Sequence, residues 1–397
     1  MISEASRPYI DASVPVLREH GVAITTTFYR SIFDELPELT NLFNMGNQAN
    51  GAQQQSLASA VFAYAANIGN PGALGPVVSR IVNKHVSVGI RAEHYPIVGR
   101  HLLGAIATTL GDAATPPLLA AWDEAYNSLA KLFIDAEQAM YAAAGIEPGQ
   151  TQTMQVTDVK RESDDVVSIR LAPTGAAALP AFKAGQYLSV TVTFPDGRRQ
   201  IRQYSLSDAP RGDSLRISVK REAAGEATPA GEVSNWIHAN VKSGSLLEVS
   251  LPFGDFLPDT ESDEPVVLLS AGIGITPMIA ALNRIAQRNP QRYVIFAHAA
   301  RNAAHQPHQD DIDAAKKAMP NLQVVLFHER LDDGVDAQDG RMEVTRLPSW
   351  PRGETNVYLC GPLAFMQAQW LGLVGAGVPV TRLHREVFGP ELLDHLL

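Results

Sequence analysis

One histidine in the first third of the sequence occupies a position from which it could bind a metal. His85 lies within VVSRIVNKHVSVGI (77–90), a segment whose apolar residues recur at nearly helical spacing. A neutral imidazole is a common ligand of transition metals, so His85 is a candidate ligand. A single histidine on an apolar helix face also fits a purely structural role in the core. The segment alone leaves both interpretations open.

Two motifs in the last two thirds indicate nucleotide chemistry. In LLSAGIGITPM (268–278) a glycine-containing turn links an apolar strand to a helix. Gly272 and Gly274 would let the backbone approach a pyrophosphate, and the helix N-terminus would offer it free N–H groups. In RQYSLS (202–207) an arginine could hold a phosphate, while a tyrosine and serines could contact a planar ring. Each motif alone also fits an ordinary turn or an exposed strand.

The elements that must position these residues change in character along the chain. In the first third, apolar residues recur every three to four positions, and this spacing predicts helices over 9–35, 52–68, 76–90, 94–110 and 117–144. Short β-branched segments separated by turns follow, and then buried apolar strands that alternate with helices. We therefore expect an all-α domain, an antiparallel β-barrel and a parallel-sheet α/β domain, over 1–146, 147–259 and 260–397.

Composition narrows the class of protein. The 397 residues are 45% hydrophobic and 19% charged, as expected of a globular chain with several domains. The net charge of −10 and the lack of a basic tract argue against nucleic-acid binding. The single cysteine, Cys360, suits a reducing cytosol. No apolar run is long enough to span a membrane, and the N-terminal residues lack a signal-peptide pattern, so we expect a cytoplasmic monomer.

Four motifs together resemble the ferredoxin–NADP reductase superfamily, in the order RQYSLS, GEVSNWIH, AGIGITPM and YLCGP. The resemblance implies a flavin-binding barrel followed by a nicotinamide-binding α/β domain. It assigns FAD to Tyr187, Arg202, Gln203, Tyr204, Ser205, Gly231, Val233 and Ser234. It assigns NAD(P)H to Gly272, Ile273, Gly274, Ile275, Thr276, Pro277, Cys360, Gly361 and Pro362. The terminal REVFGP motif would supply contacts near the flavin ring from Glu386, Val387, Phe388 and Gly389.

The helical third carries a second set of residues that looks like a globin. Phe43 would lie at a helix corner, and Gln53 precedes His85 by about 32 positions. With the reductase motifs, this set resembles a bacterial or fungal flavohaemoglobin over essentially the whole chain. The matching residues are Tyr29, Phe43, Gln53, Leu57, Lys84, His85, Tyr95 and Glu137.

The resemblance implies that His85 is the proximal ligand of a haem b iron. Glu137 and Tyr95 would support it, because a carboxylate that accepts the other imidazole N–H raises the basicity of the ligand. On the opposite side of the haem, Tyr29 would donate a hydrogen bond to O2, helped by Gln53. Leu57 would narrow that pocket above the iron. At the domain interface, the family pattern pairs Lys84 with Glu386.

The implied activity is that of a nitric oxide dioxygenase. NAD(P)H would reduce FAD, FAD would reduce the haem, and O2 at the haem would convert NO to nitrate. One alternative is reduction of lipid or alkyl hydroperoxides at the same haem, with lipid entering the pocket. Another is an O2 store or gas sensor, against which the reductase domains argue. Arg301, in HAARN (298–302), fits either a 2′-phosphate contact or a surface arginine, so the choice between NADH and NADPH stays open.

Some features depart from the family pattern or fall outside it. The segment IEPGQTQTMQV lacks the Gly-Gly-Trp stretch that often follows the globin domain, and Ala271 replaces the usual first glycine of the phosphate loop. His20, His94 and His101 are expected to be surface or structural residues. HQPHQDD (305–311) is expected to be a solvated loop or helix start.

Overall fold

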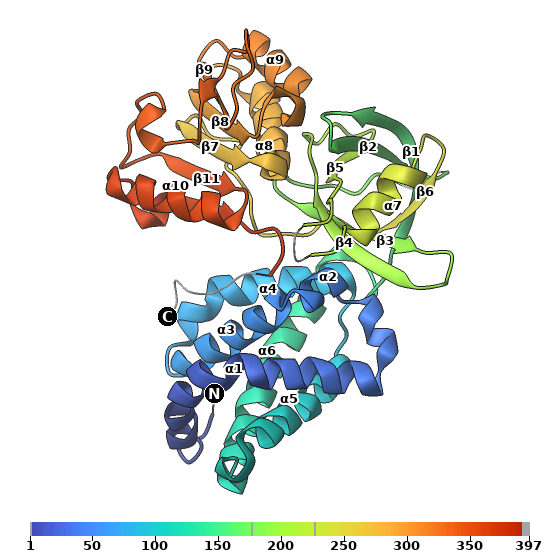
Figure 1. Cartoon of the computed structure of the whole chain (residues 1–397), viewed down its shortest axis with the longest axis vertical. Helices are drawn as coiled ribbons and strands as arrows, with labels where there is room; N and C mark the ends of the chain where they lie inside the picture. The colour runs from blue at the N-terminus through green and yellow to red at the C-terminus, as the bar shows by residue number, and fades with distance from the viewer. Residues whose placement is uncertain (1, 176–177, 226–227, 391–397) are drawn as a thin grey trace.

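The computed structural model describes residues 2–175, 178–225 and 228–390. Three domains follow one another along the chain (Figure 1). The helical domain contains α1 (Arg7–Glu35), α2 (Met45–Ala49), α3 (Ala52–Ala66), α4 (Gly75–Val88), α5 (His94–Leu110) and α6 (Pro116–Ala144). The predicted helices are confirmed, and the short α2 was not predicted. No helix in the described part of the chain is long and apolar enough to cross a membrane.

The helical domain is organised around apolar faces of α1, α5 and α6. Phe28, Ile106 and Trp122 are buried in one cluster to which these three helices contribute. Each such side chain contributes roughly 1.5–3 kcal/mol through burial of apolar surface. Thr115 caps α6 by accepting a hydrogen bond from the backbone N–H of Leu118, and a left-handed glycine ends the helix.

The second domain is a six-stranded antiparallel sheet that closes on itself. Its strands are β1 (Gln152–Arg161), β2 (Val166–Pro173), β3 (Tyr187–Thr193), β4 (Arg199–Ser205), β5 (Leu215–Lys220) and β6 (Leu246–Val249). Their order is β4-β3-β6-β1-β2-β5, and an antiparallel bridge between Leu206 and Ile217 joins the two ends of the sheet. Helix α7 (Glu232–Asn240) packs against the barrel interior through Val233 and Ile237. The predicted barrel is thereby confirmed.

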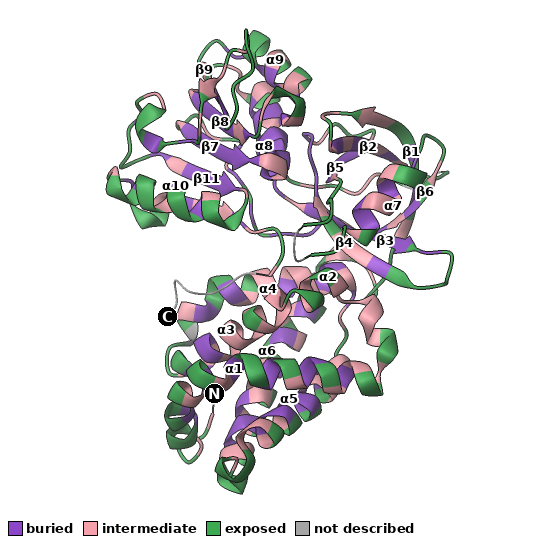
Figure 2. Cartoon of the chain, viewed as in Figure 1, coloured by how far each residue is buried: buried purple, intermediate pink, exposed green. Residues whose placement is uncertain are grey.

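The third domain is a parallel sheet covered by helices on both faces. Its elements are β7 (Val266–Ala271), α8 (Ile275–Arg288), β8 (Val294–Ala300), α9 (Gln309–Ala318), β9 (Leu322–His328), β10 (Gln338–Asp339), β11 (Asn356–Cys360), α10 (Leu363–Gly375) and β12 (Leu383–Glu386). The central strands β7, β8 and β11 are almost wholly buried (Figure 2). Leu268 belongs to the core beneath α8 and α9, and Leu269 to the core beneath α10. Successive residues thus point to opposite faces, as a strand requires.

The strand order β10-β9-β8-β7-β11-β12 locates the switch point of this sheet. β7 is the first strand, the next two strands lie on one side of it, and β11 lies on the other. Ligands of open parallel sheets bind outside the carboxyl ends of the strands at such a point. The turns after β7 and β11 are therefore the expected nucleotide site.

Candidate active site

The candidate metal ligand, His85, belongs to a buried cluster of hydrogen-bonding groups. Its Nδ1 lies 2.7 Å from Oε1 of Glu137 and 3.1 Å from the hydroxyl of Tyr95. The Tyr95 hydroxyl also donates to the same Glu137 oxygen at 2.5 Å. Glu137 is the least accessible member, with 3% of its side chain exposed against 34% for His85. The three residues come from α4, α5 and α6, so three separate helices position the ring.

The cluster fixes which nitrogen of His85 faces outward. A carboxylate accepts hydrogen bonds, so Nδ1 carries the proton and Nε2 is the nitrogen available to a metal. Burial and the nearby Glu137 carboxylate raise the pKa of Tyr95, which keeps its hydroxyl a donor. Tyr126 donates a 2.6 Å hydrogen bond to the backbone carbonyl of Tyr95 and anchors the start of α5. This donor set fits an axial imidazole ligand of a haem iron.

A second polar group lies among aromatic rings of α1 and of the turn before α2. Tyr29 is buried, with ring centroids 5.7 Å from Phe43 and 5.9 Å from Phe33. Burial raises the pKa of Tyr29 to about 12, although hydrogen bonds with Gln53 and Gln48 oppose the increase. The hydroxyl is therefore protonated at neutral pH. Leu57 packs at the edge of the same apolar cluster.

Gln48 was missed by the sequence analysis. It lies in α2, where the side chain of Asn44 caps the helix by accepting hydrogen bonds from the backbone N–H groups of Gly46 and Asn47. Asn44 before a short helix is a capping signal that could have located this turn. Gln54 donates to the Gln48 side chain at 3.0 Å, so the two amides hold each other beside Tyr29.

The helix that carries His85, α4, packs directly against the antiparallel barrel of the second domain. Tyr187, at the start of β3, joins Val82 and Val86 of α4 in one buried cluster. Its hydroxyl faces Ser87 and the carboxylate of Glu386, and burial together with that carboxylate raises its pKa. Tyr187 of the barrel thus faces α4 at Ser87, which is two residues after His85 in the sequence.

Lys84 reaches the C-terminal segment of the reductase domains. Its Nζ donates a 2.9 Å hydrogen bond to the carbonyl oxygen of Gly389. The neighbouring Asn83 accepts a 2.9 Å hydrogen bond from the backbone N–H of Gly254. In Figure 1 the chain after β12 runs down to α4, as these contacts require. The predicted partner, Glu386, is buried at the end of β12, and its pairing with Lys84 stays a prediction.

In the barrel, Arg202 is a partly buried cation that suits a phosphate. Burial lowers its pKa, and its Nη1 donates hydrogen bonds to the neutral Gln200 side chain and to the Ile201 carbonyl. Among the described residues it forms no ion pair. Tyr204 and Ser205 follow on the same strand, and Tyr204 is partly buried beside the barrel core. An arginine so placed, without a carboxylate partner, matches the donor that a flavin nucleotide phosphate needs.

Helix α7 begins at Gly231, close to the same part of the barrel. A Cβ at Gly231 would lie 2.7 Å from the Ser234 hydroxyl and 2.8 Å from the Glu222 Cβ, so only glycine fits. Val233 is buried in the barrel core, whereas Gln203 on β4 is exposed. The first N–H groups of a helix favour anions, and α7 therefore suits the pyrophosphate that the sequence places there.

The two glycine turns of the third domain pack against each other at the switch point. A Cβ at Gly274 would lie 2.5 Å from the backbone carbonyl carbon of Cys360. A Cβ at Gly361 would lie 3.2 Å from that of Ala271. Gly272 adopts φ 53°, which favours glycine, and has open space around it. The turn 272–277 and the turn 360–362 thus form one cradle at the carboxyl ends of β7 and β11.

Cys360 lies in the second of these turns, and the residues after Glu386 follow the neighbouring strand β12. The Cys360 thiol is buried, and burial together with the Glu386 carboxylate raises its pKa. Cys360 is therefore a neutral, unreactive thiol. Phe388 is 43% exposed although it is a large aromatic residue, and Val387 and Gly389 flank it.

Comparison with known proteins places the whole chain. Models of the globin family, the oxidoreductase FAD-binding domain and the oxidoreductase NAD-binding domain match residues 26–132, 153–257 and 268–370. A flavohemoprotein from Chromobacterium violaceum is 47% identical over 98% of both chains. The chain belongs to the flavohemoprotein family. Flavohemoproteins from Bordetella pertussis and Bacillus subtilis are 46% and 38% identical, over 98% and 99% of this chain.

Solved structures agree with the family. The flavohemoglobin of Malassezia yamatoensis, which holds FAD and haem, superposes with a TM-score of 0.86 and 32% identity over 98% of this chain. The FAD/NAD-binding domain of nitric oxide dioxygenase from Vibrio cholerae covers 60% of this chain with a TM-score of 0.56 and 34% identity. As a flavohemoprotein, the protein is an oxidoreductase with haem, FAD and NAD(P)H as cofactors, and the donor sets described above fit all three.

One expectation about the histidines is wrong. HQPHQDD was expected to be a solvated loop or helix start. It does lead into α9, but the residue before that helix, His308, is fully buried rather than solvated, with φ 63°. Its Nε2 lies 3.0 Å from the Ser218 hydroxyl on the barrel, and its Nδ1 lies 3.0 Å from Asp311. Arg216 of the barrel completes the group with a 3.0 Å contact to Asp311. The imidazole is buried because two domains close over it and satisfy both ring nitrogens.

Proposed function

We propose that this flavohemoprotein is a nitric oxide dioxygenase, which uses NAD(P)H and O2 to convert NO to nitrate. The observation that carries the proposal is the hydrogen bond between His85 and the buried Glu137. The V. cholerae protein that shares the reductase fold is a nitric oxide dioxygenase by name, which supports the same reading. One hydride supplies two electrons, so each NAD(P)H supports the conversion of two NO and two O2 into two nitrates and one proton.

The proximal residues favour activation of O2 over its storage. When bound, the haem supplies an iron centre for O2, and FAD converts a hydride into single electrons. Glu137 accepts a hydrogen bond from the Nδ1–H of His85 and gives the imidazole partial anionic character, which would strengthen electron donation through Nε2. Tyr95 donates to the same carboxylate and holds its orientation. A carrier that must release intact O2 has no need of so strong a donor.

The distal residues supply a tyrosine hydroxyl that two glutamine side chains orient and apolar side chains flank. The Tyr29 hydroxyl is protonated and is oriented by Gln53 and Gln48, so it can stabilise negative charge on oxygen. Phe43 and Leu57 add apolar surface beside it. Less polar surroundings strengthen a hydrogen bond to developing negative charge.

The reductase domains deliver electrons to the face of the globin domain that bears His85. In the proposal, Arg202, Tyr204 and Ser205 hold the flavin side of FAD, and the turn 272–277 with the turn 360–362 holds NAD(P)H. Tyr187 lies between this machinery and α4. Glu386, buried within reach of both Tyr187 and Cys360, connects the nicotinamide cradle with the flavin edge.

The proposal is tested by coenzyme consumption of the purified, haem- and FAD-replete protein in air. Addition of NO should accelerate NAD(P)H oxidation and produce nitrate. A parallel assay with cumene hydroperoxide in place of NO tests the peroxidase alternative. Acceleration by the peroxide alone, with none by NO, would replace the dioxygenase by a hydroperoxide reductase.

A further inference from the structure

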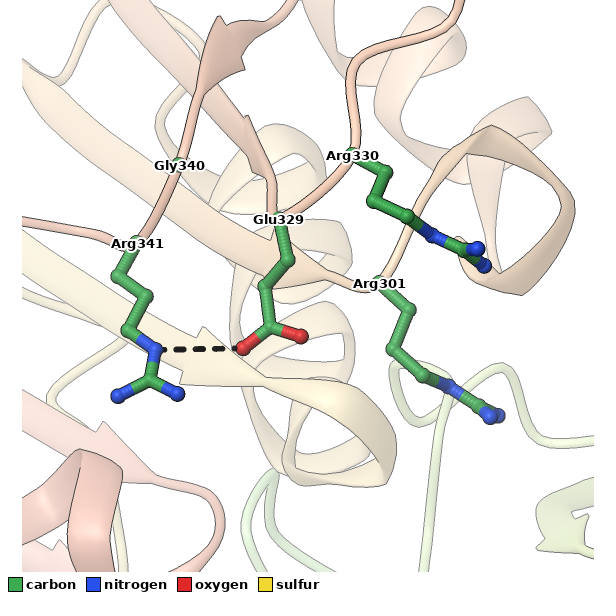
Figure 3. Close-up of a pocket in the computed structure, with 5 residues that line it drawn as sticks. All are labelled: Arg301, Glu329, Arg330, Gly340 and Arg341. Atoms are coloured by element: carbon green, nitrogen blue, oxygen red, sulfur yellow. Dashed lines mark ion pairs between the residues drawn. The ribbon is translucent and has the colours of Figure 1, made fainter.

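A basic pocket lies at the carboxyl ends of the strands on one side of the nicotinamide cradle. It has a volume of about 510 Å³ and is lined by Arg301, Glu329, Arg330, Gly340 and Arg341. Arg301 follows β8, Glu329 and Arg330 follow β9, and Arg341 follows β10. Figure 3 shows the four charged side chains of the lining, with Arg341 directed to Glu329 and with Arg330 and Arg301 extending away from that pair. Three cations and one anion give the lining a net positive charge, on a chain whose net charge is −10.

The pocket lies where the adenosine half of a bound dinucleotide is expected. The pyrophosphate site lies at the turn after β7, and the second glycine turn lies after β11. A dinucleotide that places its nicotinamide toward β11 must extend its adenosine in the opposite direction, across β8 toward β9. The backbone N–H of Arg330 donates to the carbonyl of Arg301 at 3.0 Å, so the two arginines lie at adjacent strand ends on that path.

The three arginines of the pocket differ in the ion pairs that they form. Arg341 Nε lies 3.4 Å from Glu329 Oε1, the contact drawn in Figure 3. Arg301 donates a 2.7 Å hydrogen bond to Asp165 of the barrel through Nη2, and a guanidinium has further N–H donors besides that one. Arg330 forms no ion pair with any residue in the described ranges. The pocket therefore offers an unpaired guanidinium and part of a second one to an anion.

The geometry points to a binding site for the 2′-phosphate of NADPH, formed by Arg330 and Arg301 with Arg341 as a supporting residue. This inference rests on the proposed function, because it identifies the coenzyme of the same reductase. A guanidinium fork matches phosphate oxygens in charge and geometry. An arginine just after the second strand of a nucleotide-binding sheet is the group that accommodates a 2′-phosphate, whereas a carboxylate there would accept the ribose hydroxyls of NADH.

Glu329 and Arg341 make the inference sharper. Glu329 is the one carboxylate in the lining, and its contact with Arg341 offsets its repulsion of a phosphate. Loss of Arg341 should therefore weaken NADPH binding and leave NADH binding unchanged or stronger. Loss of the Glu329 charge should have the opposite sign and strengthen NADPH binding. A set of merely solvated surface arginines would show neither effect.

Two measurements on the holoprotein test the site. The first is kcat/KM for anaerobic flavin reduction with NADPH and with NADH. The second is the dissociation constant of 2′,5′-ADP against that of 5′-AMP, measured by calorimetry without turnover. The variants are R330Q, R301Q, R341Q and E329Q, with R288Q as the matched control. Arg288 is exposed at the end of α8 and pairs with Glu261, outside the pocket.

We expect NADPH to be preferred and 2′,5′-ADP to bind more tightly than 5′-AMP. R330Q and R301Q should each lower kcat/KM for NADPH roughly tenfold, the effect of one charge-assisted hydrogen bond, and leave NADH unchanged. R288Q should leave kcat/KM unchanged with both coenzymes. Equal affinities for 2′,5′-ADP and 5′-AMP, or equal losses with both coenzymes, would overturn the inference. Those results would leave the dioxygenase proposal standing, whereas failure of both coenzymes to reduce the flavin would remove the proposed function itself.

Discussion

His85 and Glu137 are joined by a 2.7 Å hydrogen bond although 52 residues separate them in the sequence. The bond links α4 to α6 and directs Nε2 of the imidazole away from the carboxylate. In the proposed function, this bond makes His85 a strongly donating iron ligand. The other predictions of function depend on this arrangement.

Replacement of Glu137 by glutamine should weaken the iron–imidazole bond. The amide is a poorer acceptor than a carboxylate, so His85 loses anionic character, and haem affinity should fall roughly 10- to 100-fold. Resonance Raman spectra of the ferrous protein should show a lower iron–histidine stretching frequency. Asp135→Asn, which removes an exposed carboxylate from the same helix, is the control and should change neither quantity. An unaltered frequency in Glu137→Gln would contradict the role of the carboxylate.

Replacement of Tyr29 by phenylalanine should speed the release of O2. The hydroxyl is the buried donor of the distal pocket, and its loss should weaken O2 binding by about 1–2 kcal/mol, or roughly 5- to 30-fold. Stopped-flow displacement of O2 by CO measures the rate directly. Tyr64→Phe removes another tyrosine hydroxyl, one that bonds to the Ala125 carbonyl, and should leave the rate unchanged. Equal rates in the wild type and Tyr29→Phe would show that another group stabilises O2.

Replacement of Lys84 by methionine should slow electron transfer from flavin to haem. Lys84 holds the C-terminal segment against α4 through Gly389, and that contact contributes only about 1 kcal/mol or less to stability. The unfolding midpoint should therefore hardly move, while the rate of haem reduction after flavin reduction falls. Lys131→Met, on the exposed face of α6, is the matched control. If haem reduction keeps its rate, the contact has no part in docking.

The buried Asp311 should make the stability of the two reductase domains dependent on acid pH. Burial opposes its ionisation, but the hydrogen bond from His308 and the charge of Arg216 outweigh burial and lower its pKa. Because the folded pKa lies below the unfolded value of about 3.9, the stabilisation is complete above that pH and is lost as the pH falls. Asp311→Asn should therefore lower stability at neutral pH by about 2–4 kcal/mol.

Urea titrations at neutral pH and near pH 3.5 check this expectation. The difference between the wild type and Asp311→Asn should shrink at the lower pH. Asp333→Asn, at an exposed position in the same domain, should match the wild type throughout. A difference that stays constant with pH would show that packing, not charge, accounts for the effect.

The helices and strands could be predicted from the sequence because the residue patterns that indicate them are local. Pro117 in the first turn and Gly145 at the end of α6 lie where the pattern predicts, since a helix start and stop depend on a few neighbouring residues. The order of domains follows for the same reason. His85 could be singled out only because the remaining motifs indicate an electron supply.

Other features could not be read from local patterns. His308 has a sequence context of polar residues, and its burial depends on Ser218 and Arg216, which another domain supplies. The packing of Gly89 against Gly149 is similar, because a Cβ at Gly89 would lie 2.5 Å from the Gly149 Cα, a contact between two segments that share no motif. Contacts between domains are properties of the assembled chain.

The most direct test of the central claim is the origin of the oxygen atoms in the product. The holoprotein is supplied with NADPH, unlabelled NO and ¹⁸O2, and the nitrate is analysed by mass spectrometry. If the protein is a nitric oxide dioxygenase, NO accelerates coenzyme oxidation and nitrate carries both atoms of one O2 molecule. Nitrate with one labelled atom or none, or oxidation that NO does not accelerate, would contradict dioxygenation.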